Sequence, residues 1–215
     1  MPHFRSPRIW GTFSVAGGVG ATTLTFHLAR LAAKNGARTL VVESSHYAPL
    51  REILESQPPF WEDYRVGSAI ANEAMPRLTR AGFALLTRRL QSALSPELFH
   101  FVIDQVKESF DLILIDNPTE GFPSAETLFI AENSLPSLIG LHTLSQMYKP
   151  QILIVNKFTP RIKKKGAIES FVLDAQTFHI PSSADLALAL GFAITHKLAK
   201  RNEKALSAIL GEMLS

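Results

Sequence analysis

The chain of 215 residues contains no cysteine, and this absence excludes several kinds of site. Without thiols the protein has no disulfide, no cysteine-ligated zinc or iron–sulfur cluster and no thiol nucleophile. Its seven histidines do not show the spacing of a metal site, in which two histidines share one helical turn with a carboxylate. We therefore expect neither a disulfide framework nor chemistry carried by a cysteine or histidine centre.

Long apolar runs and strong charge are also lacking. No stretch of about 20 residues is free of charges and helix breakers, so we predict no membrane-spanning helix. Residues 1–8 contain Arg5 and Arg8 but no apolar segment, so we expect no signal peptide and a cytoplasmic location. The net charge of +3 and the pI of about 9.3 are too mildly basic to identify nucleic acid or anionic lipid as a partner.

The apolar residues that are present suffice for one sizeable core. At 46% hydrophobic and 19% charged residues, the chain is expected to form a single globular domain over residues 1–215. Short apolar segments typical of buried strands alternate with helical patterns. The predicted strands are 9–15, 38–43, 83–86, 110–116, 127–131, 151–155 and 178–180, and the helical patterns are 24–32, 50–54, 66–74, 96–106, 135–147 and 206–214. This alternation predicts an α/β fold, a three-layer sandwich with a mainly parallel central sheet.

A glycine-rich run joins the first predicted strand to the first predicted helix. Gly17, Gly18 and Gly20 permit a tight turn whose N–H groups point at an anion, and the following helix N-terminus adds its dipole. Thr22 supplies a hydroxyl where this class of loop binds Mg²⁺, but the preceding position, usually a lysine that reaches the outer phosphates, is Ala21. The run predicts a phosphate site made mostly of backbone, and the alternative is a tight turn without a ligand.

Residues 15–24 resemble the deviant Walker A motif of the ParA/MinD ATPases. That motif has a lysine, two glycines, any residue, a glycine, a second lysine and two hydroxyl residues. Both lysine positions are alanine in this chain, Ala16 and Ala21. The form Gly-Gly-Val-Gly-Ala-Thr-Thr is similar to that of the TadZ/CpaE branch, which helps to position pilus assembly machinery, and the cellulose-secretion BcsQ branch is similar too.

Further landmarks resemble the same family in the same order along the chain. Residues 110–118 resemble its Walker B segment, residues 125–132 the strand that follows, residues 154–157 its base-side asparagine motif, and residues 180–181 together with 187–191 its final elements. The resemblance implies a P-loop NTPase fold and ATP or ADP with Mg²⁺ as cofactors. On this basis the nucleotide would be bound by Gly17, Gly18, Val19, Gly20, Ala21, Thr22, Thr23 and Asn156, and the metal by Thr22 and Asp116. The alternatives are structural: Asp116 and Asn156 would then serve only in caps or turns at strand ends.

The groups needed for hydrolysis are incomplete. At the end of the second strand, where relatives carry two aspartates flanking one residue, the chain reads Glu43-Ser44-Ser45, and Ser45 is a poor substitute for the water-orienting carboxylate. A lost charge-assisted contact costs about 1.5–3 kcal/mol in binding, and a lost transition-state stabiliser costs roughly 10²–10³ in rate. We assign no catalytic residue and expect weak nucleotide binding, or none, with little or no hydrolysis. A substitute cation from Arg5, Arg8 or Lys157 remains an open alternative.

Three further segments bear on partners. The basic run 161–166 could bind nucleic acid or acidic lipid, but no aromatic residue interleaves with its lysines, so we favour a solvated loop and no nucleic acid. The apolar face of residues 206–214 suits a membrane-surface helix, although we favour a helix docked on the sheet. Phe60, Trp61 and Tyr64 form an aromatic cluster that would be a partner patch if exposed and core if buried.

The resemblance implies a degenerate ParA/MinD-like protein that positions or assembles a pilus or secretion apparatus. Such a protein would act in the cytoplasm or peripherally at the inner face of the membrane, as a homodimer or with a protein partner in a membrane-associated machine. Two alternatives stay open. One is a slow genuine ATPase in cell-pole, flagellar, chromosome or plasmid positioning, and the other is a nucleotide-free accessory scaffold, for example of a BcsQ-like cellulose-secretion machine.

Overall fold

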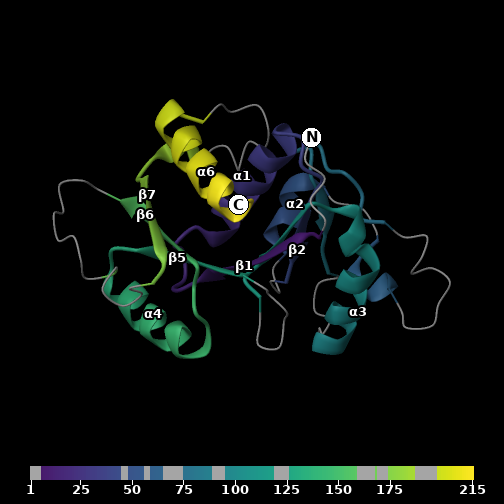
Figure 1. Ribbon diagram of the computed structural model, residues 1–215, viewed down its shortest axis with the longest axis horizontal. Coiled ribbons are helices and arrows are strands. Elements are labelled where there is room, and N and C mark those ends of the chain that lie inside the picture. Colours follow the sequence, from purple (N-terminus) through teal and green to yellow (C-terminus); the bar gives the residue numbers. More distant parts are fainter. Residues whose placement is uncertain are drawn as a thin grey trace.

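The computed structural model describes residues 6–44, 48–55, 59–64, 75–88, 95–118, 126–158, 168, 174–186 and 198–215. Several predictions fall outside these residues: the helix at 66–74, the basic run 161–166, the roles considered for Arg5 and Ser45, and the resemblance over 187–191. The described elements form three layers, a central sheet with helices on both faces (Figure 1).

The central sheet contains seven strands in the described part of the chain. They are β1 (Arg8–Ser14), β2 (Thr39–Glu43), β3 (Ala84–Leu86), β4 (Leu112–Asp116), β5 (Glu126–Glu132), β6 (Ile152–Phe158) and β7 (Gln176–Pro181). Their order is β3-β2-β4-β1-β5-β6-β7, and every pair of neighbouring strands is parallel. The predicted three-layer α/β fold is confirmed. Because the strands are parallel, all their carboxyl ends lie on one edge of the sheet, where open α/β folds bind ligands.

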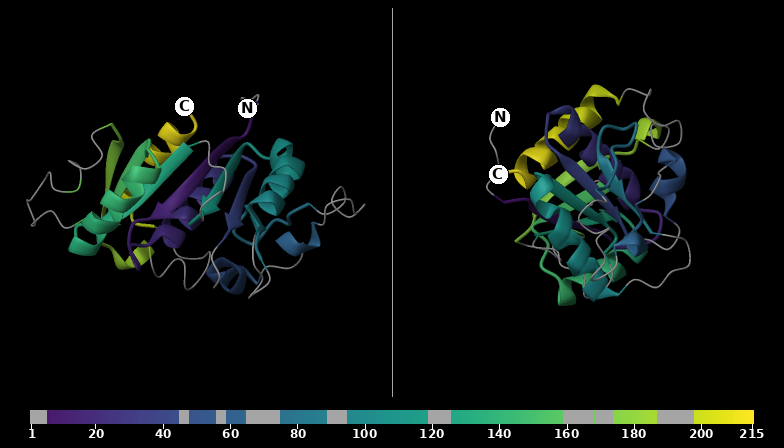
Figure 2. Two further views of the ribbon diagram at one scale, coloured as in Figure 1. Left: turned by 90° about the horizontal axis from the view of Figure 1, so that it is seen from below. Right: turned by 90° about the vertical axis from the view of Figure 1, so that its right-hand side faces the viewer.

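Helices cover the sheet because its strands are apolar on both sides. Every residue of β2 and β4 is buried, as expected for strands in a parallel sheet covered on both faces. Helices α1 (Ala21–Lys34), α2 (Pro49–Leu54) and α6 (Lys200–Met213) pack on one face, and α3 (Pro96–Val106) and α4 (Leu135–Met147) pack on the other (Figures 1 and 2). Side chains from β1 enter the core on both faces, so this strand lies between the two helical layers.

Local signals account for two of the helix boundaries. Ser95 caps α3 as predicted, since its hydroxyl accepts a hydrogen bond from the Leu98 N–H at 3.1 Å and Pro96 occupies the first turn. Ser134 caps α4 in the same way through the Ser137 N–H. The predicted bounds of both helices match the observed ones.

The C-terminal helix is docked on the core. Its apolar residues Leu206, Ile209, Leu210 and Met213 are buried, and α6 lies beside α1 and β7. The docked arrangement that we favoured is therefore observed. A membrane-surface role for this helix is wrong for this structure, because the apolar face that would enter the bilayer is already covered. None of the described helices is both long and apolar enough to span a bilayer.

The aromatic cluster after α2 belongs mainly to the core. Trp61, in the 3₁₀ helix η1 (Trp61–Asp63), and Tyr64 are both fully buried, and the Trp61 ring lies 4.6 Å from that of Phe99 on α3. Phe60 is half-buried and lies under the guanidinium of Arg51. The alternative of an exposed patch is excluded for Trp61 and Tyr64.

Candidate functional site

The glycine run forms the connection between β1 and α1 at the carboxyl edge of the sheet. Gly18 and Gly20 have φ angles of +75° and +92°, in the left-handed region that glycine adopts without strain. A Cβ atom added at Gly17 or Gly18 would meet no atom within 4 Å, so this side of the loop is open. Gly20 is the N-cap of α1 and provides no side chain, which leaves the first N–H groups of the helix without a side-chain cap.

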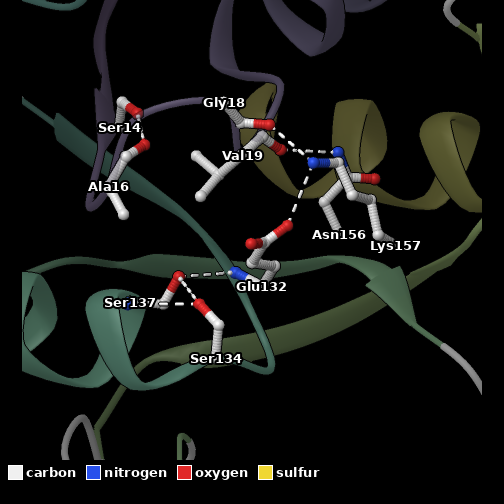
Figure 3. A network of polar contacts seen from close by, with 9 residues as sticks. All are labelled: Ser14, Ala16, Gly18, Val19, Glu132, Ser134, Ser137, Asn156 and Lys157. Atoms are coloured by element: carbon white, nitrogen blue, oxygen red, sulfur yellow. Dashed lines mark hydrogen bonds and ion pairs between the residues drawn. The ribbon is translucent and has the colours of Figure 1, made fainter.

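Strand β6, which is separated from β1 by β5, contacts the loop through two side chains (Figure 3). The Asn156 side-chain amide donates to the Val19 carbonyl at 2.7 Å, and the Lys157 ammonium donates to the Gly18 carbonyl at 2.6 Å. Lys157 also forms an ion pair with Glu132, at the end of β5, at 3.0 Å. Asn156, which we predicted to contact the base, thus lies at the loop and uses its nitrogen to fix the loop backbone.

Helix α4 touches the start of the loop, a contact that the sequence did not reveal. A Cβ atom at Gly140 would overlap the carbonyl oxygen of Val15, so the helix and the loop backbone are in direct contact. Only glycine allows this approach. A movement of the loop backbone at Val15 would therefore meet α4 directly.

The two predicted metal ligands lie together. The Thr22 hydroxyl, in the first turn of α1, donates to the Asp116 carboxylate, at the end of β4, at 2.7 Å. The Thr25 hydroxyl lies 3.5 Å from the other carboxylate oxygen of Asp116 and forms a hydrogen bond of 2.8 Å with the Thr12 hydroxyl. Burial raises the pKa of Asp116 to about 6, an effect that the hydrogen bonds from Thr22 and Thr25 oppose.

A second buried carboxylate, Glu43, ends the neighbouring strand opposite Asp116. It accepts hydrogen bonds from the backbone N–H groups of Leu50 at 2.6 Å and Arg51 at 3.2 Å, and from the Thr87 hydroxyl at 2.9 Å. Burial, with the nearby charge of Asp116, raises the pKa of Glu43 to about 7 against these hydrogen bonds. The Glu43 carboxylate thus accepts hydrogen bonds from N–H groups in the first turn of α2, which would otherwise lack a partner. This structural role accounts for a carboxylate at this position.

Ser44 connects the ends of β2 and β4. Its hydroxyl lies 2.6 Å from the backbone carbonyls of both Asp116 and Asn117. The side chain of Asn117 in turn accepts from the Ser14 N–H at 2.8 Å. The end of β4 is therefore fixed to strands on both sides of it, which sets the position of the Asp116 carboxylate relative to α1.

The three cations considered as substitutes for the missing lysines are placed differently. Arg8 begins β1, at the edge opposite the loop, and pairs with Glu126 at 3.0 Å, so it is wrong as a substitute. Arg5 lies outside the described residues. Lys157 reaches the loop itself, and its side chain is 48% exposed, so the ammonium is accessible to a ligand.

The residues present fit a magnesium nucleotide. The loop has an open side at two glycines, and a threonine hydroxyl and a carboxylate, both oxygen ligands of the kind Mg²⁺ prefers, converge beside it. A metal held by Thr22 and Asp116 would replace the hydrogen bond between them. Among the described residues there is no group of three or more His, Cys, Asp or Glu side chains that could hold a metal by themselves.

Comparison with known proteins gives structural neighbours only. No protein-family model and no curated protein sequence matches the chain. The MinC:MinD cell division complex of Aquifex aeolicus is similar at 20% identity, over 96% of each chain, with a TM-score of 0.75. A putative plasmid partition protein of Borrelia burgdorferi bound to AMPPNP is 16% identical, over 96% of this chain and 98% of that one, with a TM-score of 0.69.

A Cyanothece McdA in complex with ATP is also 16% identical, over 97% of this chain and 96% of that one, with a TM-score of 0.69. At this level of identity the likeness establishes the fold alone. The chain has the P-loop NTPase fold of MinD and ParA proteins over nearly its whole length.

Proposed function

We propose that the chain is a ParA/MinD-type positioning or assembly factor that binds ATP or ADP with Mg²⁺ weakly and hydrolyses it slowly or not at all. The observation that carries this proposal is the pairing of Thr22 with Asp116 at 2.7 Å beside a glycine loop that is open at Gly17 and Gly18. The neighbours solved with ATP and AMPPNP support the choice of ligand.

The residues of this chain would divide the work as follows. Backbone N–H groups of the loop and of the first turn of α1 would bind the phosphates. Thr22 and Asp116 would hold Mg²⁺, which neutralises phosphate charge when bound. Ala16 and Ala21 provide no cation, so the phosphates would lose two charge-assisted contacts, each worth about 1.5–3 kcal/mol. Weak binding, micromolar or poorer, follows from that loss.

A second candidate, a slow genuine ATPase in cell or plasmid positioning, is favoured by one observation. The Lys157 ammonium lies 2.6 Å from the Gly18 carbonyl, so a cation is present at the loop although it comes from β6. If it stabilises the transferred phosphoryl group, slow turnover would be abolished by Thr22→Ala and reduced by Lys157→Ala. Lys149→Ala, which removes an exposed lysine outside the site, is the matched control.

We propose a homodimer as the functional state, with α4 in the contact surface. This helix carries no charged residue and exposes Leu135, Ile139 and Met147 by 69%, 60% and 58%. Because Gly140 of the same helix touches the loop at Val15, nucleotide at the loop would alter the surface offered to a second copy. In light scattering with Mg²⁺ and ATP, Ile139→Asp should abolish dimerisation. Leu78→Asp, at an exposed apolar residue beside the edge strand β3, should not.

A pilus or secretion apparatus is the assembly that we propose for this factor. The similarity of residues 17–23 to the TadZ/CpaE form supports it, and the MinC:MinD complex is a precedent for a protein partner in this fold. The location would be cytoplasmic or at the inner face of the membrane. Because the apolar face of α6 is buried, membrane association would then come through the partner and not through this helix.

Isothermal titration of the purified chain with ATP and ADP, with and without Mg²⁺, tests the proposal. Saturable, magnesium-dependent binding that Gly20→Val abolishes would support it. A valine there has the wrong φ for its side chain, and its Cβ would lie 2.7 Å from the Asn156 amide nitrogen that holds the loop. Absence of heat and of thermal shift at millimolar nucleotide would refute nucleotide binding and leave the scaffold alternative.

A further inference from the structure

An arginine at the end of β3 is buried without a full set of hydrogen-bond partners. Arg88 is 2% exposed, and its Nη1 atom donates to the Ser44 carbonyl at 3.3 Å. Its Nε and Nη2 atoms are also buried, and no acceptor for either is found within the described part of the chain. Arginine stays protonated in proteins, so these two donors belong to a permanent buried charge.

A second buried donor lies in the adjoining segment. The Trp61 indole Nε1 is buried and has no acceptor among the described residues. The backbone N–H of Trp61 donates to the Thr87 carbonyl at 3.0 Å, and Phe60 and Thr87 form a parallel bridge, so η1 lies directly beside the end of β3. The end of β3 and η1 thus contribute three buried N–H donors that have no acceptor among the described residues.

Such an arrangement is costly unless an acceptor is bound. A buried donor without a partner costs about 1–3 kcal/mol, and a buried charge without one costs more. The Nε and Nη2 atoms form the edge of the guanidinium that binds carboxylate or phosphate with two parallel hydrogen bonds. The unused edge of Arg88 is therefore the edge that fits an oxyanion.

We propose that the carboxyl end of β3 and η1 form a second anion site, in which Arg88 and Trp61 bind one oxyanion, a phosphate or a carboxylate. The site is separate from the glycine loop, because β2 and β4 lie between β3 and β1 in the sheet. It is connected to the candidate metal site through Ser44, which accepts from Arg88 and whose hydroxyl lies 2.6 Å from the Asp116 carbonyl. The inference does not depend on the proposed nucleotide function.

The direct test uses the unaltered protein. In ¹⁵N NMR spectra, the indole resonance of Trp61 and one arginine Nε resonance should shift saturably when inorganic phosphate replaces chloride at constant ionic strength. The only other tryptophan, Trp10, is the internal control, since its indole already donates to the Met213 carbonyl at 3.2 Å. Spectra of Trp61→Phe assign the two indoles. A Trp61 resonance that moves no more than that of Trp10 overturns the proposal.

Variants separate this site from the loop. In a Gly20→Val background, phosphate should still raise the Tm by about 2–4 °C, and adding Arg88→Gln should remove that rise. A Tm rise that survives Arg88→Gln would count against the site. If Arg88→Gln does not fold, Trp61→Phe in the same background should bind phosphate at least several-fold more weakly, and unchanged binding would overturn the assignment.

Parallel titrations with acetate and with ATP identify the source of the oxyanion. A Trp61 shift with acetate alone supports a carboxylate, and one with inorganic phosphate supports a free phosphate. A shift in the Gly20→Val variant with ATP alone supports a nucleotide phosphate at this site. If ATP binds the unaltered chain while no anion moves the Trp61 resonance, this inference fails and the proposed function stands.

Discussion

Replacing Glu43 by glutamine should destabilise the protein at acidic pH and leave it equally stable or more stable at alkaline pH. The carboxylate is buried at the end of β2 and receives three hydrogen bonds, from the N–H groups of Leu50 and Arg51 and from the Thr87 hydroxyl. Glutamine keeps the shape of the side chain but has only one acceptor atom. In Glu43→Gln at least one N–H group at the start of α2 therefore lacks its partner.

Two terms of opposite sign set the size of the effect. The NH₂ group of glutamine cannot accept a hydrogen bond, and losing this acceptor oxygen costs about 1–3 kcal/mol. The cost applies at pH 5.0 as well, because the hydroxyl oxygen of a protonated carboxyl keeps acceptor capacity that an NH₂ group lacks. In the unaltered chain, burial raises the pKa of Glu43 from 4.5 to about 7, a difference equivalent to about 3 kcal/mol. Because the folded pKa is the higher one, the folded state keeps a proton that the unfolded state loses. The stabilisation that this retained proton gives the folded state is fully present below pH 4.5 and is lost as the pH rises through 7.

Urea unfolding of both proteins at pH 5.0 and pH 8.5, followed by tryptophan fluorescence, measures the inversion. Glu43→Gln should be about 1–3 kcal/mol less stable at pH 5.0 and equal to or more stable than the unaltered chain at pH 8.5. Glu108→Gln, which removes an exposed carboxylate, should differ from the unaltered chain by less than about 0.5 kcal/mol at both pH values. A Glu43→Gln difference that is the same at both pH values would refute the reasoning from burial.

Three further predictions concern the loop and its surroundings. Gly140→Ala should lower the free energy of unfolding by about 2–4 kcal/mol in urea titrations, because its Cβ overlaps the loop backbone, whereas Gly211→Ala, in open space on α6, should raise it by up to about 1 kcal/mol. Thr22→Ala should remove the dependence of ATP affinity on Mg²⁺ in calorimetry, and undiminished dependence would exclude this hydroxyl as a ligand. Glu132→Gln releases Lys157 from a half-exposed ion pair worth about 0–1 kcal/mol. It should therefore tighten ATP binding by up to about fivefold, and weaker binding would show that the pair holds Lys157 in place.

The sequence predicted the fold well where short apolar segments are buried on both faces. Strands β2 and β4 read as continuous apolar runs, and both were found close to their predicted bounds. The edge strand β7 was predicted as three residues but covers Gln176–Pro181, because an exposed edge needs few apolar residues. Strand β6 extends beyond the predicted Val155 to Phe158: Asn156 is buried and pairs with Glu132 of β5, and Phe158 pairs with Pro181 of β7 after a register shift.

The candidate site could be predicted only in part, because local motifs do not record long-range contacts. Thr22 and Asp116 were expected together, since a motif and the parallel sheet place both at one edge. Gly140 contacts Val15, a residue far from it in the sequence, and a single glycine in a helical pattern does not predict such a contact. The same is true of the buried Arg88, which in sequence reads as one of two ordinary arginines after a strand.

The contacts of the loop explain how its shape can exist without the two lysines of the motif. The Gly18 and Val19 carbonyls are held by Lys157 and Asn156 from β6, and the left-handed turns at Gly18 and Gly20 cost little because both residues are glycine. An alanine in place of the motif lysine at position 16 or 21 therefore removes a positive charge but none of these hydrogen bonds to the loop. Loop geometry and phosphate chemistry are thus separable in this chain, so a well-formed loop bears on the proposed binding and not on hydrolysis. Among the described residues, Lys157 is the cation whose ammonium contacts the loop while also pairing with Glu132, and substitution at Lys157 therefore tests turnover.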